Sequence, residues 1–177
     1  MQTAKNTISE YPNVLELQGD EDQFLTFQLA GEMFAIEILS IKEIIQYGRV
    51  TQVPMMPDFV RGVINLRGSV VPVVDLQARF GRESSPASKR TCIVIVEVET
   101  DDETQDIGVI VDSVSEVLAI GMNDIEKAPS FGARLHPEFI AGMGKVNDEF
   151  VIILNVSRVL SLTELATIAS QLDEVDS

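Results

Sequence analysis

The sequence predicts an all-β protein built from two small five-stranded barrels, with short helical turns and a helix near the C-terminal end. Three observations predict this fold. Val and Ile recur in short clusters bounded by Gly, Pro, Asn and Asp, which is the composition of pleated strands joined by tight turns. A block of residues occurs twice with the same apolar pattern. Near the C-terminus the apolar spacing changes to that of a helix.

The repeat aligns residues 59–80, FVRGVINLRGSVVPVVDLQARF, with residues 139–160, FIAGMGKVNDEFVIILNVSRVL, at a constant offset of 80. A second pair of segments, ILSIKEII at 38–45 and VDSVSEVL at 111–118, occurs in the same order, and both contain Ser-x-x-Glu. Few residues are identical. Two blocks with matched apolar patterns in the same order nevertheless indicate an internal duplication.

Each copy is expected to begin with a hairpin of strands in which apolar and polar residues alternate. In the first copy this hairpin covers residues 24–38, and in the second it covers 91–98 with 107–111. The acidic stretch at 97–106, EVETDDETQD, is expected to be a solvated loop.

A short helical turn is expected after each of these hairpins. The serine–glutamate pairs are Ser40 with Glu43 and Ser113 with Glu116. This spacing is that of a capping box, in which the two side chains satisfy free backbone amides at the start of a helix.

Next, each copy has a short strand and a loop marked by proline, VPMMP at 53–57 and APS at 128–130. The repeated block then supplies a second hairpin, which gives about five strands per copy. Five short antiparallel strands leave exposed edges unless the sheet curls, so a small barrel is the predicted architecture of each copy.

The tips of the repeated hairpins differ in chemistry. Arg67-Gly68 in the first copy aligns with Asn147-Asp148 in the second, and both pairs suit a two-residue turn. The fold therefore requires a turn there and not an arginine, so Arg67 is expected to be free to reach a partner.

After Asn155 the apolar spacing becomes helical, and a C-terminal amphipathic helix is expected to pack on the barrels. The predicted limits are a flexible tail at 1–20, a folded region at 21–165, a helix at 157–172 and an acidic tail at 173–177. Within the folded region the two barrels are expected at about 21–85 and 86–160, with strand exchange between them left open.

Composition and charge narrow the classes of partner. The formal net charge of the 177-residue chain is -15, so nucleic acid is not an expected ligand. No window reaches the 18 or so apolar residues of a membrane span, and the N-terminus lacks the apolar core of a signal peptide. We therefore expect a cytoplasmic protein that is not inserted into a membrane.

Side chains that commonly carry chemistry are scarce. His136 is the only histidine and Cys92 the only cysteine, so neither a zinc site nor a Cys-His nucleophile pair is expected. The GMGK sequence at 142–145 lacks the spacing of a phosphate-binding loop. We expect no catalytic residues, no metal and no cofactor, although a metal-independent hydrolase is left open. Binding is the favoured class, in a groove between the two barrels.

These residues carry a resemblance to a known family. FVRGVINLRGSVVPVVDLQARF, preceded by FAIEILSIKEII and followed by IGVIVDSVSEVL and ILNVSRVL, strongly resembles the CheW family of bacterial chemotaxis coupling proteins. The match runs from about Gln23 to Leu160. It implies two SH3-like barrels, no catalytic activity, and an adaptor that links methyl-accepting chemoreceptors to the regulatory domain of the histidine kinase CheA.

Carried over by position, the resemblance implies a receptor-facing groove. Its residues would be Ile41, Glu43, Gly62, Arg67, Val114 and Val117, with Cys92 at the margin. Ile41 and Glu43 would lie on the first helical turn, and the two valines on the equivalent turn of the second copy. Glu43 and Arg67 would lie near each other and orient the partner, and the helical receptor tip would place an apolar stripe in the groove.

The kinase contact implied by the resemblance is residues 125–131, with Phe131 as an aromatic anchor. Some family members have a basic residue where this chain has Glu126, so Lys127 is the expected basic contact. The resemblance also implies weak self or ring contacts within receptor arrays at the membrane or cell pole, and a monomer in dilute solution. The alternative function is a CheW-like scaffold of a chemosensory pathway that does not control flagella.

Overall fold

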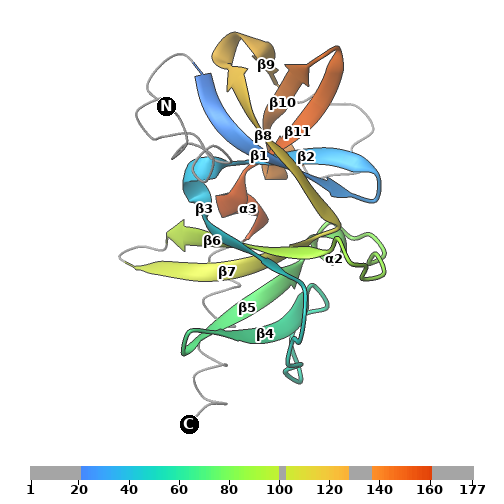
Figure 1. Ribbon diagram of the computed structural model, residues 1–177, viewed down its shortest axis with the longest axis vertical. Coiled ribbons are helices and arrows are strands. Elements are labelled where there is room, and N and C mark those ends of the chain that lie inside the picture. The colour runs from blue at the N-terminus through green and yellow to red at the C-terminus, as the bar shows by residue number, and fades with distance from the viewer. Residues whose placement is uncertain (1–20, 100–102, 128–136, 161–177) are drawn as a thin grey trace, which may run out of the picture.

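Eleven strands, arranged in two sheets, make up most of the part of the chain that the computed structural model describes, residues 21–99, 103–127 and 137–160 (Figure 1). Sheet A consists, in spatial order, of β8 (Ser113–Gly121), β1 (Glu21–Leu29), β2 (Glu32–Glu37), β11 (Glu149–Leu154), β10 (Ile140–Val146) and β9 (Ile125–Glu126). Sheet B consists of β3 (Ile41–Gln46), β6 (Cys92–Glu99), β7 (Thr104–Val111), β5 (Ser69–Asp75) and β4 (Val60–Leu66). The predicted mainly-β fold is confirmed.

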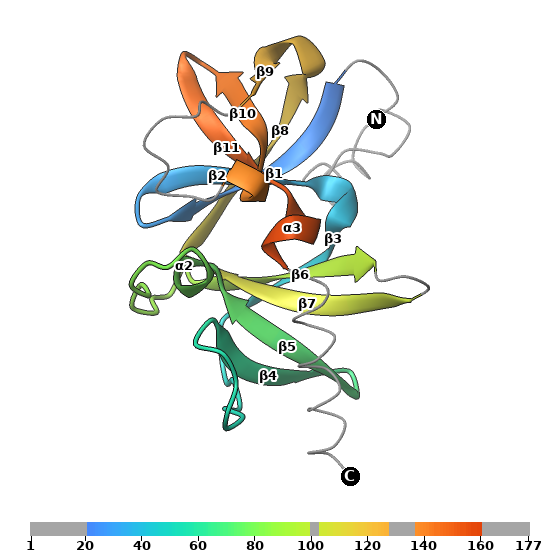
Figure 2. The same ribbon diagram turned by 180° about the vertical axis from the view of Figure 1, so that it is seen from behind.

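Helical structure in the described residues is limited to single turns. The helices α2 (Leu76–Arg79) and α3 (Val156–Val159) follow β5 and β11, and 3-10 turns occupy Ile38–Ser40, Met122–Asp124 and Pro137–Phe139. Figure 2 shows α3 between the two sheets. Most of the expected helix at 157–172 lies outside the described residues, as do the expected tails at 1–20 and 173–177.

Each sheet takes one hairpin from the other half of the chain. The β1–β2 hairpin belongs to sheet A together with β8 to β11, and the β6–β7 hairpin belongs to sheet B together with β3, β4 and β5. The two joints are the parallel pairs β2–β11 and β5–β7. The sheets therefore do not correspond to the sequential halves 21–85 and 86–160, and strand exchange between the halves is present.

The repeated block has the same structure in both copies. β4 and β10 begin and end at positions that are 80 residues apart, and α2 and α3 occupy equivalent positions. The side chains of Asp75 and Asn155, also 80 residues apart, each accept a hydrogen bond from a backbone amide in the first turn of these helices. A short acceptor side chain at the N-cap is what starts a helix at this point.

The hairpin tips form the predicted two-residue turns. Arg67 and Gly68 have φ values of 51° and 88°, and Asn147 and Asp148 have φ values of 51° and 65°. Two successive positive φ values suit the right-handed twist of the flanking strands. The Asn65 Oδ1 atom accepts a hydrogen bond of 2.8 Å from the Gly68 amide, which fixes the first tip.

The core is layered, because alternate residues of a strand point to opposite sides of its sheet. On β6, Ile93 and Ile95 pack inside sheet B, whereas Val94 and Val96 pack in a central cluster between the two sheets. Phe24 and Ile153 pack inside sheet A. Fully burying a Val, Ile, Leu or Phe side chain stabilises the fold by about 1.5–3 kcal/mol, so the central cluster is what holds the two sheets together.

The segment that follows β3 reaches the opposite edge of sheet B. The strand order places β3 and β4 at opposite edges, yet Thr51, shortly after β3, forms an isolated bridge with Val63 of β4 through hydrogen bonds of 2.9 and 2.8 Å. Gly62 lies beneath this bridge at φ 154°, and a Cβ atom on it would overlap the Thr51 carbonyl oxygen. The bridge links the two sides of sheet B at one point, although the strand order of the sheet is open, and only glycine fits below it.

We therefore expect Gly62→Ala to destabilise the protein by about 2–4 kcal/mol, because the methyl group collides with backbone and the φ value disfavours a side chain. Chemical denaturation measures this change. Gly48→Ala is the matched control, since a Cβ atom at Gly48 has nothing within 4 Å. Equal stability of the two variants would contradict the role of Gly62 beneath the Thr51 bridge.

Two local predictions are wrong. The segments that follow Ser40 and Ser113 are strands β3 and β8, not helical turns. The acidic stretch 97–106 is not a loop throughout, because β6 extends to Glu99 and β7 begins at Thr104. The first error arises from a β-bulge in each of the strands β3 and β8.

Candidate protein-binding face

Two edge strands, one from each sheet, build the candidate site. β3 is an edge of sheet B and β8 is an edge of sheet A, and both lie on the side of the molecule that faces the viewer in Figure 1. They are the repeat-equivalent segments ILSIKEII and VDSVSEVL. The site is therefore made twice, once from each copy of the duplicated unit.

Each of these strands contains one extra residue at the same place. In β3, Ile41 pairs with Val96 and Ile44 pairs with Val94, so three steps on β3 match two steps on β6. In β8 the same mismatch separates two valines: Val114 pairs with Phe27 and Val117 pairs with Leu25. Such a β-bulge turns residues three apart to the same face of the sheet. An apolar spacing of three also occurs in helices, which is why the sequence pattern resembles a helical turn here.

The bulges direct four apolar side chains towards the central core. Directly paired residues lie on the same face of a sheet, and the partners Val96, Val94, Phe27 and Leu25 all belong to the central cluster. The side chains concerned are Ile41, Ile44, Val114 and Val117, and all four are partly buried against this cluster. They reach the core without being covered by it, so their outer surface remains available for contact.

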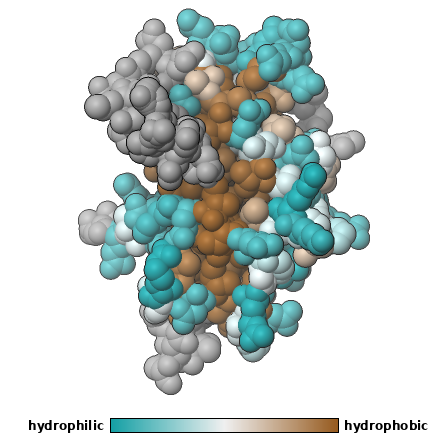
Figure 3. Space-filling view, viewed as in Figure 1, coloured by the Kyte–Doolittle hydropathy of each residue, from teal (hydrophilic) through white to brown (hydrophobic). Residues whose placement is uncertain are grey.

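Cys92 belongs to the same face. It pairs with Gln46 of β3 on one side and with Val111 of β7 on the other, and it packs against the central cluster. Partial burial raises the pKa of its thiol, so the side chain is neutral near neutral pH and acts as a small apolar group. Figure 3 shows an apolar strip that runs down this side of the molecule from sheet A to sheet B.

We use the term between-sheet face for these five partly buried residues: Ile41, Ile44, Cys92, Val114 and Val117. Ile44 was missing from the predicted set. It could have been found from the repeat, because Ile44 aligns with Val117 in the paired segments.

Glu43 and Arg67 form an ion pair beside the between-sheet face. The Arg67 guanidinium donates to both carboxylate oxygens of Glu43, with a distance of 3.4 Å between Nη1 and Oε1. The hydrogen bond from Arg67 lowers the pKa of the Glu43 carboxyl, and the bond to Glu43 raises the pKa of Arg67. The Arg67 side chain is 71% exposed and that of Glu43 is 29% exposed, so the arginine still presents donors to solvent.

Acidification, not alkalinisation, breaks this ion pair. Because Arg67 lowers the pKa of Glu43, the pair is intact above the ordinary value of 4.5 and breaks only as the pH falls through the lower pKa of the folded protein. An NMR titration of the Glu43 side chain should show a midpoint below 4.5 that rises in an Arg67→Asn variant. An unchanged midpoint in that variant would contradict the pairing.

The remaining predicted site residues lie elsewhere or outside the described part. Gly62 is buried beneath Thr51, so the structure gives it a packing role. Lys127 is exposed just after β9. Phe131 lies outside the described residues.

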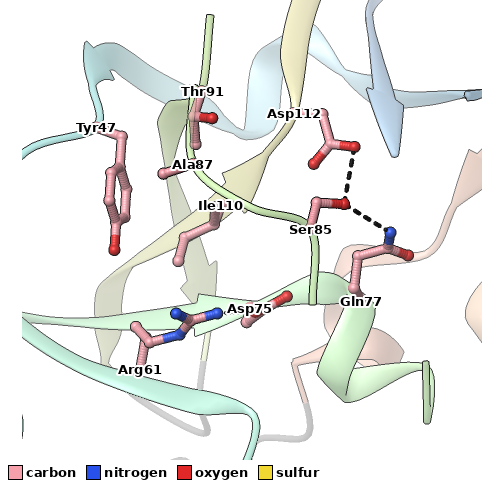
Figure 4. Close-up of a pocket in the computed structure, with 9 residues that line it drawn as sticks. All are labelled: Tyr47, Arg61, Asp75, Gln77, Ser85, Ala87, Thr91, Ile110 and Asp112. Carbon is pink, nitrogen blue, oxygen red and sulfur yellow. Dashed lines mark hydrogen bonds and ion pairs between the residues drawn. The ribbon is translucent and has the colours of Figure 1, made fainter. Parts of the chain in front are cut away.

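A second candidate, a polar pocket on the side of sheet B, has a structural role (Figure 4). Its cavity measures about 30 Å³, far below the size of a small-molecule site. Asp75 pairs with Arg61 and accepts a 2.6 Å hydrogen bond from the Ser84 hydroxyl. Asp112 accepts bonds from the Ser85 hydroxyl and from the Ala30 amide in the β1–β2 turn. These contacts tie the loop after α2 to both sheets.

Neither a metal-ligand cluster nor a membrane-spanning helix is found in the described residues. Within residues 21–99, 103–127 and 137–160, no group of three or more His, Cys, Asp and Glu side chains is arranged to hold a metal ion. In the same ranges, no helix is both long and apolar enough to cross a membrane.

Comparisons with known proteins give the family. The family model described as the CheW-like domain matches residues 23–164. The chemotaxis protein CheW of Klebsiella aerogenes is 33% identical over 146 residues, which cover 82% of this chain and 86% of the relative. The chemotaxis protein CheW of Helicobacter pylori is 35% identical over 138 residues, covering 78% and 81% of the two chains.

A solved structure and a further relative extend this likeness. The crystal structure of the scaffolding protein TtCheW from Thermoanaerobacter tengcongensis matches with a TM-score of 0.73 and 33% identity, covering 83% of this chain and 92% of the other. Protein PilI of Pseudomonas aeruginosa is 32% identical over 120 residues, covering 66% and 64% of the two chains. With a family model across most of its length, curated relatives above 30% identity and a matching solved fold, this chain belongs to the CheW-like family.

Proposed function

We propose that the protein is a chemotaxis adaptor that couples methyl-accepting chemoreceptors to the histidine kinase CheA. The observation that carries the proposal is the between-sheet face with its Glu43–Arg67 pair. The duplicated fold brings these residues to one side of the molecule, and the family resemblance implies receptor contact at most of them; Gly62, which the resemblance also names, is buried instead.

The chemistry of this face suits the helical tip of a receptor. Partly buried Ile and Val side chains in a strip offer an apolar surface that one stripe of a helix covers, and burial of apolar area supplies most of the affinity in such contacts. Arg67 at the edge adds a charged group whose use is orientation and partner choice. Gly62 contributes indirectly, because it leaves room for the bridge from Thr51 to β4, the first strand of the Arg67 hairpin.

The kinase would bind a different surface. The exposed Lys127 follows β9, the edge strand of sheet A, and the regulatory domain of the kinase would contact it there. Separate surfaces for the two partners are what an adaptor requires. In this proposal the protein makes and breaks no covalent bonds, uses no metal or cofactor, works in the cytoplasm and joins receptor arrays through weak contacts with its partners.

Co-purification tests the proposal. The protein is mixed with a receptor cytoplasmic fragment, with the kinase regulatory domain, and with both. We expect each pair to co-elute and the mixture of three to form a ternary complex. Failure to bind either component would contradict the proposal.

A second candidate function is a scaffold in a chemosensory pathway that does not control flagella. The similarity to PilI of Pseudomonas aeruginosa favours keeping it. Binding of this chain to a receptor and kinase from one chemosensory gene cluster, and not to those of another, distinguishes the two functions.

A further inference from the structure

The repeat assigns a counterpart to Glu43. In the aligned segments ILSIKEII and VDSVSEVL, Glu43 and Glu116 occupy the same position. Both stand within the bulge of their strand, immediately before an apolar residue of the between-sheet face, Ile44 in β3 and Val117 in β8. The site therefore has one carboxylate on each of its two equivalent strands.

The two carboxylates differ in what they bind. Glu43 pairs with Arg67 from the tip of the β4–β5 hairpin. The equivalent tip of the β10–β11 hairpin is Asn147-Asp148, which offers no cation. Glu116 is exposed, and among the described residues no lysine or arginine forms an ion pair with it. Half of the duplicated site thus contains its own ion pair, and the other half presents an unpaired carboxylate.

The backbone of Glu116 is nevertheless fixed. The Thr26 hydroxyl donates a 2.7 Å hydrogen bond to the Glu116 carbonyl oxygen and accepts a 3.1 Å bond from the Glu116 amide. Thr26 is 1% exposed, so a buried side chain of β1 clamps the bulge from the core side. A fixed backbone limits the positions that the side chain of this exposed residue can take and lowers the entropy cost of binding a partner there.

We propose that Glu116 is a specificity-determining residue that binds a lysine or arginine on the helical receptor tip. The partner's cation takes at Glu116 the role that Arg67 takes at Glu43. This inference rests on the proposed function and adds to it the chemistry of the partner: an apolar stripe flanked, on the side that faces β8, by a basic side chain. An exposed pair of this kind contributes more to partner choice than to affinity.

The test measures binding of a receptor cytoplasmic fragment by calorimetry at low salt. Glu116→Gln should weaken binding about threefold, and Glu116→Lys about tenfold or more, because the second change places like charges together. Melting temperatures should stay at the wild-type value, since only the backbone of Glu116 holds the fold. Asp124→Asn is the matched control: it removes one exposed negative charge from the turn after β8 and should leave binding within about twofold of wild type.

A charge exchange gives the decisive readout. Each basic residue of the receptor tip is changed in turn to glutamate and tested against Glu116→Lys. One of these receptor variants should recover most of the lost affinity, which a merely structural role of Glu116 would not produce.

The outcomes separate this inference from the proposed function. If Arg67→Glu weakens binding about tenfold or more while Glu116→Gln binds as tightly as wild type, the receptor site stands and the proposed role of Glu116 is wrong. If Asp124→Asn weakens binding as much as Glu116→Gln does, the effect is one of net charge and the inference is again wrong. If the wild-type protein does not bind the receptor fragment, the proposed function fails, and this inference fails with it.

Discussion

Replacing Arg67 with glutamate should weaken binding of a receptor cytoplasmic fragment by about tenfold or more, which corresponds to at least about 1.4 kcal/mol of binding free energy. The variant places a second carboxylate next to Glu43 and removes the cation that faces the partner. Arg67 is at an exposed hairpin tip, so the melting temperature should scarcely change. Calorimetry of binding and thermal unfolding of the same samples measure the two effects.

The second copy of the repeat supplies the control for the turn. Asn147 has the same φ value of 51° as Arg67, and asparagine tolerates this conformation well. Arg67→Asn therefore keeps the turn and removes only the cation, and it should lose less affinity than the glutamate variant. Lys145→Gln, an exposed cation on sheet A, should bind normally. Normal binding by Arg67→Glu in a folded protein would show that the receptor does not contact this tip.

Replacing Asp75 with alanine should strongly destabilise the protein. The Asp75 side chain is 5% exposed and pairs with Arg61, which is 36% exposed. It also accepts hydrogen bonds from the Ser84 hydroxyl and from the Ala78 amide at the start of α2. The loss of a helix cap, a buried hydrogen bond and a charge partner should destabilise the fold by about 3 kcal/mol, a fall of about 10 °C in melting temperature.

Asp75→Asn separates the components of this loss. The equivalent residue in the second copy is Asn155, whose side chain caps α3. Asparagine at position 75 should therefore keep the cap and lose the charge pair, at a cost of about 1–2 kcal/mol. If alanine and asparagine destabilise the protein equally, the hydrogen bond from the Ala78 amide to the side chain of residue 75 contributes no stability, which would contradict its role as a helix cap.

The duplication can be predicted from the sequence alone, because apolar alternation and turn residues are local signals. Strand boundaries in the repeated hairpins and the positive φ values at Arg67 and Asn147 follow from them. The path of the chain between the sheets was not predictable in this way. The parallel joints β2–β11 and β5–β7 pair segments far apart in the sequence, and no local pattern records which sheet a hairpin joins.

The segments that form β3 and β8 show that an apolar spacing of three residues does not distinguish a helical turn from a bulged strand. Ile41 and Ile44 are three residues apart, as apolar residues of a helix often are, yet one extra residue in a strand gives the same spacing. The alignment of the two segments does predict one thing correctly: Val114 and Val117 adopt the same local structure as Ile41 and Ile44. The Glu43–Arg67 contact came from the family resemblance, because it joins opposite edges of one sheet.

Hydrogen exchange of the protein, alone and with a saturating receptor fragment, tests the central idea most directly. β3 and β8 are sheet edges, so their outward amides are free to exchange in the isolated protein and become protected when a partner covers them. We predict that protection on binding is concentrated in residues 41–46 and 113–118. Protection confined to other strands, with β3 and β8 unchanged, would contradict the account.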